Sequence, residues 1–269
     1  MTLMNLIDEE TASGVGYLTL GRAKGTLLAI THGWRDSALA WQWVIKALDG
    51  AGANPAYPVV AVQRQAGDHA GLESAALLEA YAGQVVDAVM TAAAPLERVV
   101  LIGQSMGGAV AELAAVELGE RVAGLAIVTP SPLAGSSLPV EVVELFEDLC
   151  AKGSEEAAAV RLAQAYRPSD EVRTRFKIAT PEESARSCQE SFYAWWGGHP
   201  AGRQLSRVKA PTMLVVTDDT FFPETMLRAS VAPRFQDIEI AEMRGVGHNP
   251  HLEAPERLAE VISTFIDRL

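Results

Sequence analysis

The amino-acid sequence predicts an α/β fold, in which a mostly parallel central sheet is flanked by helices and interrupted by one helical insertion. Short apolar runs rich in β-branched residues alternate with longer segments of helical periodicity. Such runs are typical of strands buried on both faces, and their alternation with helices favours a parallel sheet covered on both sides. The 269 residues are also 49% apolar, spread along the whole chain, so a sizeable core can form.

The predicted strands are short apolar segments bounded by glycine, proline or polar residues. The first 20 residues alternate weakly and contain Gly14, Gly16 and Gly21, so they predict a hairpin. Beyond the hairpin, strands are expected at residues 27–31, 59–62, 99–102, 125–128, 213–216 and 238–243.

The predicted helices carry apolar side chains at helical spacing. Ser37 stands where it can cap the first of them. The last carries Leu258, Ile262 and Phe265 along one stripe. The helices are expected at residues 37–48, 72–90, 107–118 and 252–269.

One long segment breaks the alternation of strand and helix. Residues 130–208 contain no convincing buried strand, are helix-prone and charged, and include six prolines. We therefore expect a core formed by residues 1–129 and 209–269, with residues 130–208 inserted as a helical lid. Such a lid would lie over the carboxyl ends of the strands, where open α/β sheets bind ligands.

Composition narrows the expected partners. The net charge of −12 disfavours nucleic acid and anionic membranes, so a small molecule is the expected ligand. There is no secretory signal and no apolar run of about 18 residues, so we expect a cytoplasmic protein. Cys150 and Cys188 lie in no metal-ligand spacing, and neither a metal nor a cofactor is expected. The sequence leaves open whether these cysteines are bonded and whether the chain forms a homo-oligomer.

The strongest functional signal is the motif GQSMG at residues 103–107, between a predicted strand and a predicted helix. A turn this tight forces its central residue, Ser105, into a strained conformation, and the flanking glycines remove side chains that would collide. The helix N-terminus favours the negative charge that forms when a serine attacks a carbonyl. The motif therefore predicts Ser105 as a nucleophile.

A serine nucleophile needs a base and a carboxylate that orients the base. His248 is the best base, because it lies in a glycine-containing loop between a predicted strand and the last helix. His251, next to Pro250, is expected to be structural. The acid should follow the strand at 213–216, where Asp218 and Asp219 are adjacent, and spacing alone does not choose between them.

Attack on a carbonyl also requires hydrogen-bond donors for the oxyanion. The backbone N–H of Met106 follows the nucleophile and is one expected donor. The other is the N–H of Trp34, in the His-Gly-Trp turn that follows the strand at 27–31.

These residues together resemble the α/β-hydrolase family of serine hydrolases, in particular its esterases and lactonases with a helical cap. The resemblance rests on the order Ser105, Asp219, His248, on the HGW turn, and on the stretch GHNPHLEAPE at 247–256. In the family the acid stands four residues before a proline, which is the relation of Asp219 to Pro223, so the resemblance implies Asp219. The acid loop is one residue shorter than usual, and residues 63–68 depart from the family pattern.

The resemblance implies hydrolysis of a carboxylic ester, thioester or lactone of a small, apolar substrate through an acyl-enzyme on Ser105. The alternatives are carbon–carbon bond hydrolysis, cofactor-free haloperoxidase (perhydrolase) chemistry, and a non-catalytic receptor of a small ligand. Ser105 separates the chain from the haloalkane dehalogenase and epoxide hydrolase branches, whose nucleophile is an aspartate. Aromatic residues of the lid, the acid loop and the HGW turn are expected to line the pocket: Trp34, Trp195, Trp196, Phe221 and Phe222.

Overall fold

A computed structural model describes residues 7–10, 16–20, 26–50, 57–65, 72–92 and 98–269. They form one eight-stranded sheet in the order β1-β2-β4-β3-β5-β6-β7-β8. The six strands β4, β3, β5, β6, β7 and β8 are parallel to one another. In contrast, β1 pairs antiparallel with β2, and β2 pairs antiparallel with β4. The strands are β1 (Ile7–Glu10), β2 (Gly16–Leu20), β3 (Leu27–Thr31), β4 (Val59–Gln63), β5 (Val99–Gln104), β6 (Val122–Val128), β7 (Thr212–Thr217) and β8 (Ile238–Met243).

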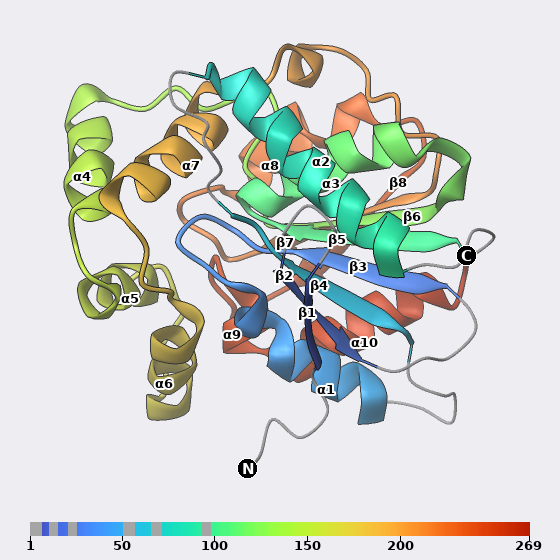
Figure 1. Cartoon of the computed structure of the whole chain (residues 1–269), viewed down its shortest axis with the longest axis horizontal. Coiled ribbons are helices and arrows are strands. Elements are labelled where there is room, and N and C mark those ends of the chain that lie inside the picture. The colour runs from blue at the N-terminus through green and yellow to red at the C-terminus, as the bar shows by residue number, and fades with distance from the viewer. Residues whose placement is uncertain (1–6, 11–15, 21–25, 51–56, 66–71, 93–97) are drawn as a thin grey trace.

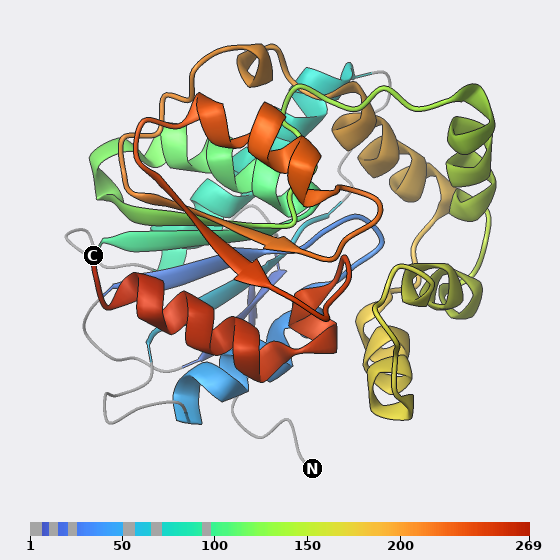
Figure 2. The same cartoon turned by 180° about the vertical axis from the view of Figure 1, so that it is seen from behind.

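Helices cover both faces of this sheet (Figures 1 and 2), as the sequence predicts. The helices α2 (Ser74–Ala92), α3 (Met106–Leu118) and α8 (Glu224–Ser230) lie on one face, and α1 (Gln42–Gly50), α9 (Pro250–Glu253) and α10 (Pro255–Ile266) on the other. The central strands β3 and β5 are buried along their whole length, because each face packs against a separate apolar cluster. The prediction of a hairpin at the start of the chain is confirmed for β1 and β2, and its connecting residues lie outside the described ranges.

Two predicted helices differ in detail from the structure. The segment predicted at 252–269 forms two helices, because Pro255 lacks an N–H and starts a new helix. At the segment predicted for 37–48, a 3-10 turn (Ala38–Trp41) precedes α1, and Ser37 stands at the N-cap position of this turn. Ser37 makes no side-chain cap hydrogen bond, and its hydroxyl instead donates to the C=O of Ala179 at 2.8 Å.

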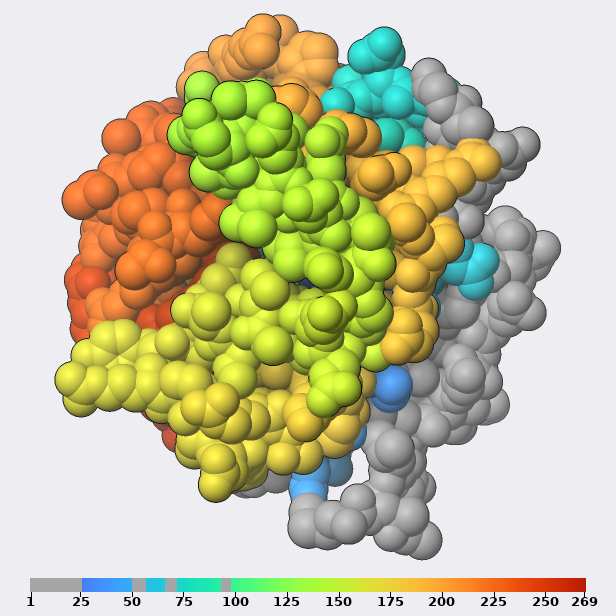
Figure 3. Space-filling view, turned by 90° about the vertical axis from the view of Figure 1, so that its left-hand side faces the viewer, coloured from blue at the N-terminus to red at the C-terminus, as the bar shows by residue number. Residues whose placement is uncertain are grey.

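Between β6 and β7 the chain forms α4 (Val140–Cys150), α5 (Ser154–Leu162), α6 (Asp170–Ala179) and α7 (Ala185–Gly197), and no strand interrupts this fully described segment. These four helices and the loops that join them, called the lid from here on, stack against one end of the molecule (Figure 1). Figure 3 shows the yellow-green to yellow atoms of α4, α5 and α6 covering much of that side. No helix within the described ranges has the length and apolar character that crossing a bilayer requires.

Candidate active site

Ser105 occupies a strained turn between β5 and α3. Its backbone has φ 52° and ψ −125°, a region that non-glycine residues rarely adopt and that costs of order 1–3 kcal/mol. The flanking glycines allow the turn to close. A side-chain carbon on Gly103 would lie 2.1 Å from the Gly107 carbonyl oxygen, and one on Gly107 would lie 2.4 Å from that of Thr31. The predicted collision at both glycines is confirmed.

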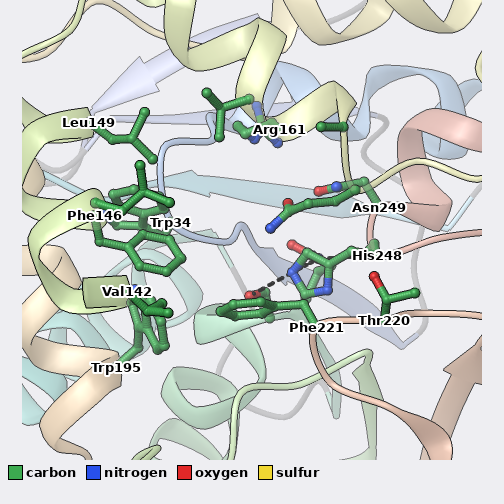
Figure 4. Close-up of a pocket in the computed structure, with 16 residues that line it drawn as sticks. Trp34, Val142, Phe146, Leu149, Arg161, Trp195, Thr220, Phe221, His248 and Asn249 are labelled. Carbon is green, nitrogen blue, oxygen red and sulfur yellow. Dashed lines mark hydrogen bonds between the residues drawn. The ribbon is translucent and has the colours of Figure 1, made fainter. Parts of the chain in front are cut away.

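The structure brings Ser105, His248 and Asp219 into one row of hydrogen bonds. His248 Nε2 lies 3.1 Å from Ser105 Oγ (Figure 4, dashed line), and His248 Nδ1 lies 2.6 Å from Asp219 Oδ2. All three residues are buried. Desolvation by itself would raise the pKa of Asp219, but the charge of His248 and hydrogen bonds from His248, Phe221 N–H and Phe222 N–H lower it. Asp219 is therefore held as a carboxylate against the imidazole.

Asp218 points away from this row. Its Oδ2 accepts the N–H of Gly245 at 2.7 Å, and its Oδ1 lies 3.4 Å from the guanidinium of Arg244 at the surface. Adjacent residues at the end of a strand point to opposite sides, so only one of the pair can face His248. The structure places Asp219 there.

The HGW turn lies directly against the turn that carries Ser105. A side-chain carbon on Gly33 would lie 2.5 Å from Gln104 Oε1 and 3.2 Å from Ser105 Cβ. A larger residue would have to displace the Gln104 side chain and press on Ser105, so glycine favours this approach. Met106 follows Ser105 as the first residue of α3. The roles of the Trp34 and Met106 N–H groups as oxyanion donors remain predictions.

A buried arginine that the sequence did not reveal holds the HGW turn. Arg64, at the end of β4, donates from Nη1 to Thr31 Oγ1 at 2.5 Å and to the C=O of His32, and from Nη2 to the C=O of Gly33 at 3.0 Å. Burial lowers the pKa of Arg64 to about 10, which leaves it charged at neutral pH. The C=O of Gly33 and the N–H of Trp34 belong to one peptide group, so this contact also fixes the direction of that N–H.

A cavity of about 320 Å³ opens in front of Ser105 and His248. Three of the predicted pocket residues line it, namely Trp34, Trp195 and Phe221. The other two do not. Trp196 stacks on Phe192 with ring centroids 5.6 Å apart, and Phe222 packs behind Phe221 and lines a neighbouring cavity. The remaining lining residues, most of them from the lid, are Gln104, Val142, Leu145, Phe146, Leu149, Val160, Arg161, Ala163, Gln164, Thr220 and Asn249.

The loop that carries His248 is bonded to the lid. The N–H of His248 donates to the C=O of Gln164 at 3.2 Å. The carboxylate of Glu253 accepts from the N–H groups of Tyr166 and Gly247, both at 2.8 Å, and from that of Asn249 at 3.1 Å. The Glu253 side chain therefore connects the lid loop to the histidine loop. No sequence motif predicts this connection.

A second connection between core and lid is a buried ion pair. Asp36 Oδ2 lies 2.9 Å from Arg161 Nη2 in the lid and 2.9 Å from His251 Nε2 in the core. Burial would raise the pKa of Asp36, but Arg161 and His251 outweigh it and lower that pKa to about 2. His251 also stacks on Trp41 with centroids 5.1 Å apart, so its expected structural role is confirmed. Among the described residues, no cluster of three or more His, Cys, Asp or Glu is arranged to hold a metal ion.

Comparison with known proteins agrees with this architecture. Over 126 residues the chain is 32% identical to Esterase PIR7B of Oryza sativa subsp. japonica, a match that covers 46% of each protein. The matches to curated relatives cover 46% and 65% of those relatives' lengths. Among solved structures, a thermophilic esterase from Thermogutta terrifontis aligns with a TM-score of 0.74 and 19% identity over 98% of both chains. A bromoperoxidase from Bacillus anthracis aligns with a TM-score of 0.79 and 16% identity over 97% of this chain and all of that one. Residues 27–261 match the model of the alpha/beta hydrolase family, and the chain therefore belongs to that family.

Proposed function

We propose that this protein is a carboxylic ester hydrolase that works through an acyl-enzyme on Ser105. The observation that carries the proposal is the buried row Ser105–His248–Asp219, with the serine hydroxyl facing a cavity large enough for a small molecule. A serine, a histidine within hydrogen-bond distance and a carboxylate that orients the histidine form the arrangement that acyl transfer requires.

In the first half of the reaction, Ser105 Oγ attacks the ester carbonyl while His248 Nε2 takes the hydroxyl proton. Asp219 keeps the proton on Nδ1 and stabilises the imidazolium. The negative oxygen that forms accepts hydrogen bonds from the N–H groups of Trp34 and Met106. His248 then gives its proton to the leaving alcohol oxygen, and the C–O bond breaks.

In the second half, water occupies the place of the alcohol. His248 removes its proton as the water oxygen attacks the acyl carbon, and the same donors stabilise the second oxyanion. Return of the proton to Ser105 Oγ releases the carboxylic acid. Thioesters and lactones react by the same steps.

Esters are preferred as the substrate class because curated relatives are named esterases. The structural neighbours carry several chemistries on one fold, so they do not separate the alternatives. We further infer that residues 130–208 act as the lid that selects the substrate, with residues 1–129 and 209–269 as the catalytic core.

The test compares the wild-type protein with Ser105→Ala on a panel of p-nitrophenyl esters. The wild type should release p-nitrophenol, and the variant should lose about 10⁶ in turnover, because a triad without its nucleophile retains little catalysis. A fluorophosphonate should label Ser105 and leave the variant unlabelled, and circular dichroism should show an unchanged fold. Equal rates for both proteins would refute the assignment. Peracid formation with hydrogen peroxide but no ester cleavage would favour the perhydrolase alternative. Ligand binding without any turnover would favour the alternative of a non-catalytic receptor.

A further inference from the structure

The cavity has two chemically different sides (Figure 4). One side is formed by apolar side chains of α4 and α7 together with Trp34. Phe146 packs edge-on to Trp34 at 5.1 Å and to Trp195 at 5.4 Å, which makes a rigid aromatic wall. The other side, around His248, combines polar side chains with the ring of Phe221, whose centroid lies 6.1 Å from that of His248. Its polar members are Arg161, Gln164, Thr220 and Asn249.

The position of His248 decides which half of an ester lies on which side. His248 Nε2 must reach the leaving alcohol oxygen to protonate it, so the alcohol portion has to extend past the histidine. Asn249 follows His248 in the chain, and Figure 4 shows Asn249 and Thr220 beside it, across the cavity from Phe146 and Trp34. The acyl portion is thereby directed to the aromatic wall, and the alcohol portion to the polar side.

The polar side carries hydrogen-bonding capacity that the protein itself does not use. Asn249 is only 3% exposed, yet its side-chain nitrogen is hydrogen-bonded to none of the described residues. The side-chain amide of Gln164 likewise has no hydrogen bond within the described part of the chain. A buried donor without a partner costs roughly 1–3 kcal/mol, and a ligand that supplies the acceptor removes this cost. This cost applies to the buried amide of Asn249, whereas Gln164 is half-buried and lines the same cavity. The two amides are therefore placed to bind one ligand group.

The charge on this side favours a neutral group. Arg161 is the cation that lines it, and its guanidinium is already paired with Asp36 at 2.9 Å and with Thr180 Oγ1 at 2.7 Å. Asn249 and Gln164 each offer both a donor and an acceptor. Their complement is a carboxamide or a similar neutral group with its own donor and acceptor.

We propose that the preferred substrates are esters of a small apolar acid with an alcohol that bears a neutral hydrogen-bonding group, which Asn249 and Gln164 recognise. This inference rests on the proposed ester hydrolysis and adds the class of the alcohol.

The test uses two esters of one acid, chosen as the acyl group of the fastest p-nitrophenyl ester. One is the carboxamidomethyl ester and the other the isobutyl ester, whose alcohol portion has the same number and branching of non-hydrogen atoms but no polar group. The quantity measured is the ratio of kcat/KM for the amide ester to that for the isobutyl ester. Comparing this ratio between proteins cancels the different reactivities of the two alcohols.

Asn249→Leu should lower the ratio about tenfold, because the variant keeps the volume but loses the hydrogen bond. Gln164→Leu should lower it in the same direction, and it provides the test if Asn249→Leu does not fold. The matched control is Ser131→Ala. Ser131 is another buried residue whose polar atom is bonded to none of the described residues, and it lies outside the lining of this cavity, so the ratio should not change.

Each outcome decides between the two proposals. A ratio that stays at the wild-type value in both leucine variants overturns the assignment of the alcohol and leaves ester hydrolysis intact. A wild type that hydrolyses neither these esters nor p-nitrophenyl esters, and is not labelled at Ser105, overturns both.

Discussion

The two halves of the candidate site are held in different ways. The half built on the sheet is fixed mainly by the main chain, through the positive φ of Ser105 and the close approach of Gly103 and Gly107 to neighbouring backbone atoms, with Arg64 as the side chain that holds the HGW turn. The half built from the lid is fixed by side chains, chiefly by the buried pair of Asp36 with Arg161. The reacting geometry therefore depends on local backbone conformation, and the shape of the cavity on contacts between distant residues.

Arg35 adds to this difference. Its guanidinium donates to the C=O groups of Leu149 at the end of α4, at 3.2 Å, and of Lys152 just beyond it, at 3.1 Å, and it lies 3.5 Å from Cys188 Sγ in α7. The next residue, Asp36, binds Arg161 of α5. One short loop after the HGW turn thus anchors three lid helices. Changes in the sheet half should alter the rate of the chemical step, whereas changes in the lid half should alter stability and substrate choice.

After the loss of the nucleophile itself, the largest effect is expected at the carboxylate that orients His248. Asp219→Asn should lower turnover about 10⁴-fold, because the asparagine favours the wrong imidazole tautomer and cannot stabilise the imidazolium. Asp218→Asn is the matched control, since Asp218 bonds Gly245 and Arg244 instead, and most activity should remain. Steady-state kinetics on a p-nitrophenyl ester gives both values. Similar mild effects from the two variants would mean that another group orients the histidine.

The lid half is tested by Arg161→Met. The variant removes the guanidinium that pairs with the buried carboxylate of Asp36 and leaves His251 as its neighbour. The free energy of unfolding at pH 7 should therefore fall by about 3–5 kcal/mol, the usual cost of breaking a buried ion pair. Because the pKa of Asp36 lies at about 2 in the folded protein, below its usual value, its contribution is complete above that usual value and is lost as the pH falls toward 2. The difference between wild type and variant should therefore shrink in acid.

Urea unfolding at pH 7, 4 and 3 measures this difference. Arg173→Met is the control, because Arg173 pairs with Asp170 in the same lid but at the surface, and the variant should change stability by less than about 1 kcal/mol. A difference between wild type and Arg161→Met that does not depend on pH would show that Arg161 acts through packing alone.

A smaller effect is expected at Arg64, which orients the peptide group that carries the Trp34 N–H. Arg64→Met should lower kcat about 10²-fold with little change in KM, comparable to the loss of one oxyanion donor. The affinity for a boronic acid that mimics the tetrahedral intermediate should fall by the same factor, and Arg64→Lys should recover part of both. Arg234→Met, which breaks the buried pair with Glu112 away from the site, should cost stability but not kcat. If KM rises while kcat stays constant, Arg64 shapes the pocket only.

Local sequence patterns predicted the sheet half of the site better than the lid half. The turn at Ser105, the loop at His248 and the strands that precede them depend on neighbouring residues, so the spacing of glycines and apolar runs is informative. The sequence predicted less well which of two adjacent aromatic side chains faces the cavity. Trp195 and Trp196 are one residue apart on α7 and point in directions about 100° apart, so only Trp195 lines the cavity. The partners of Arg64 and Arg161 lie far away in the sequence, and no periodicity reveals such pairs.

Glu253 has a consequence for protein engineering. Its carboxylate binds the N–H of Tyr166 in the lid loop and those of Gly247 and Asn249 on either side of His248. Gly247 also packs so close to the Gln164 carbonyl that any side chain there would collide with it. A lid grafted from a homologue would therefore carry a foreign loop into contact with the histidine. Chimaeras that exchange residues 247–253 together with the lid should keep this junction intact, and the two segments are expected to diversify together.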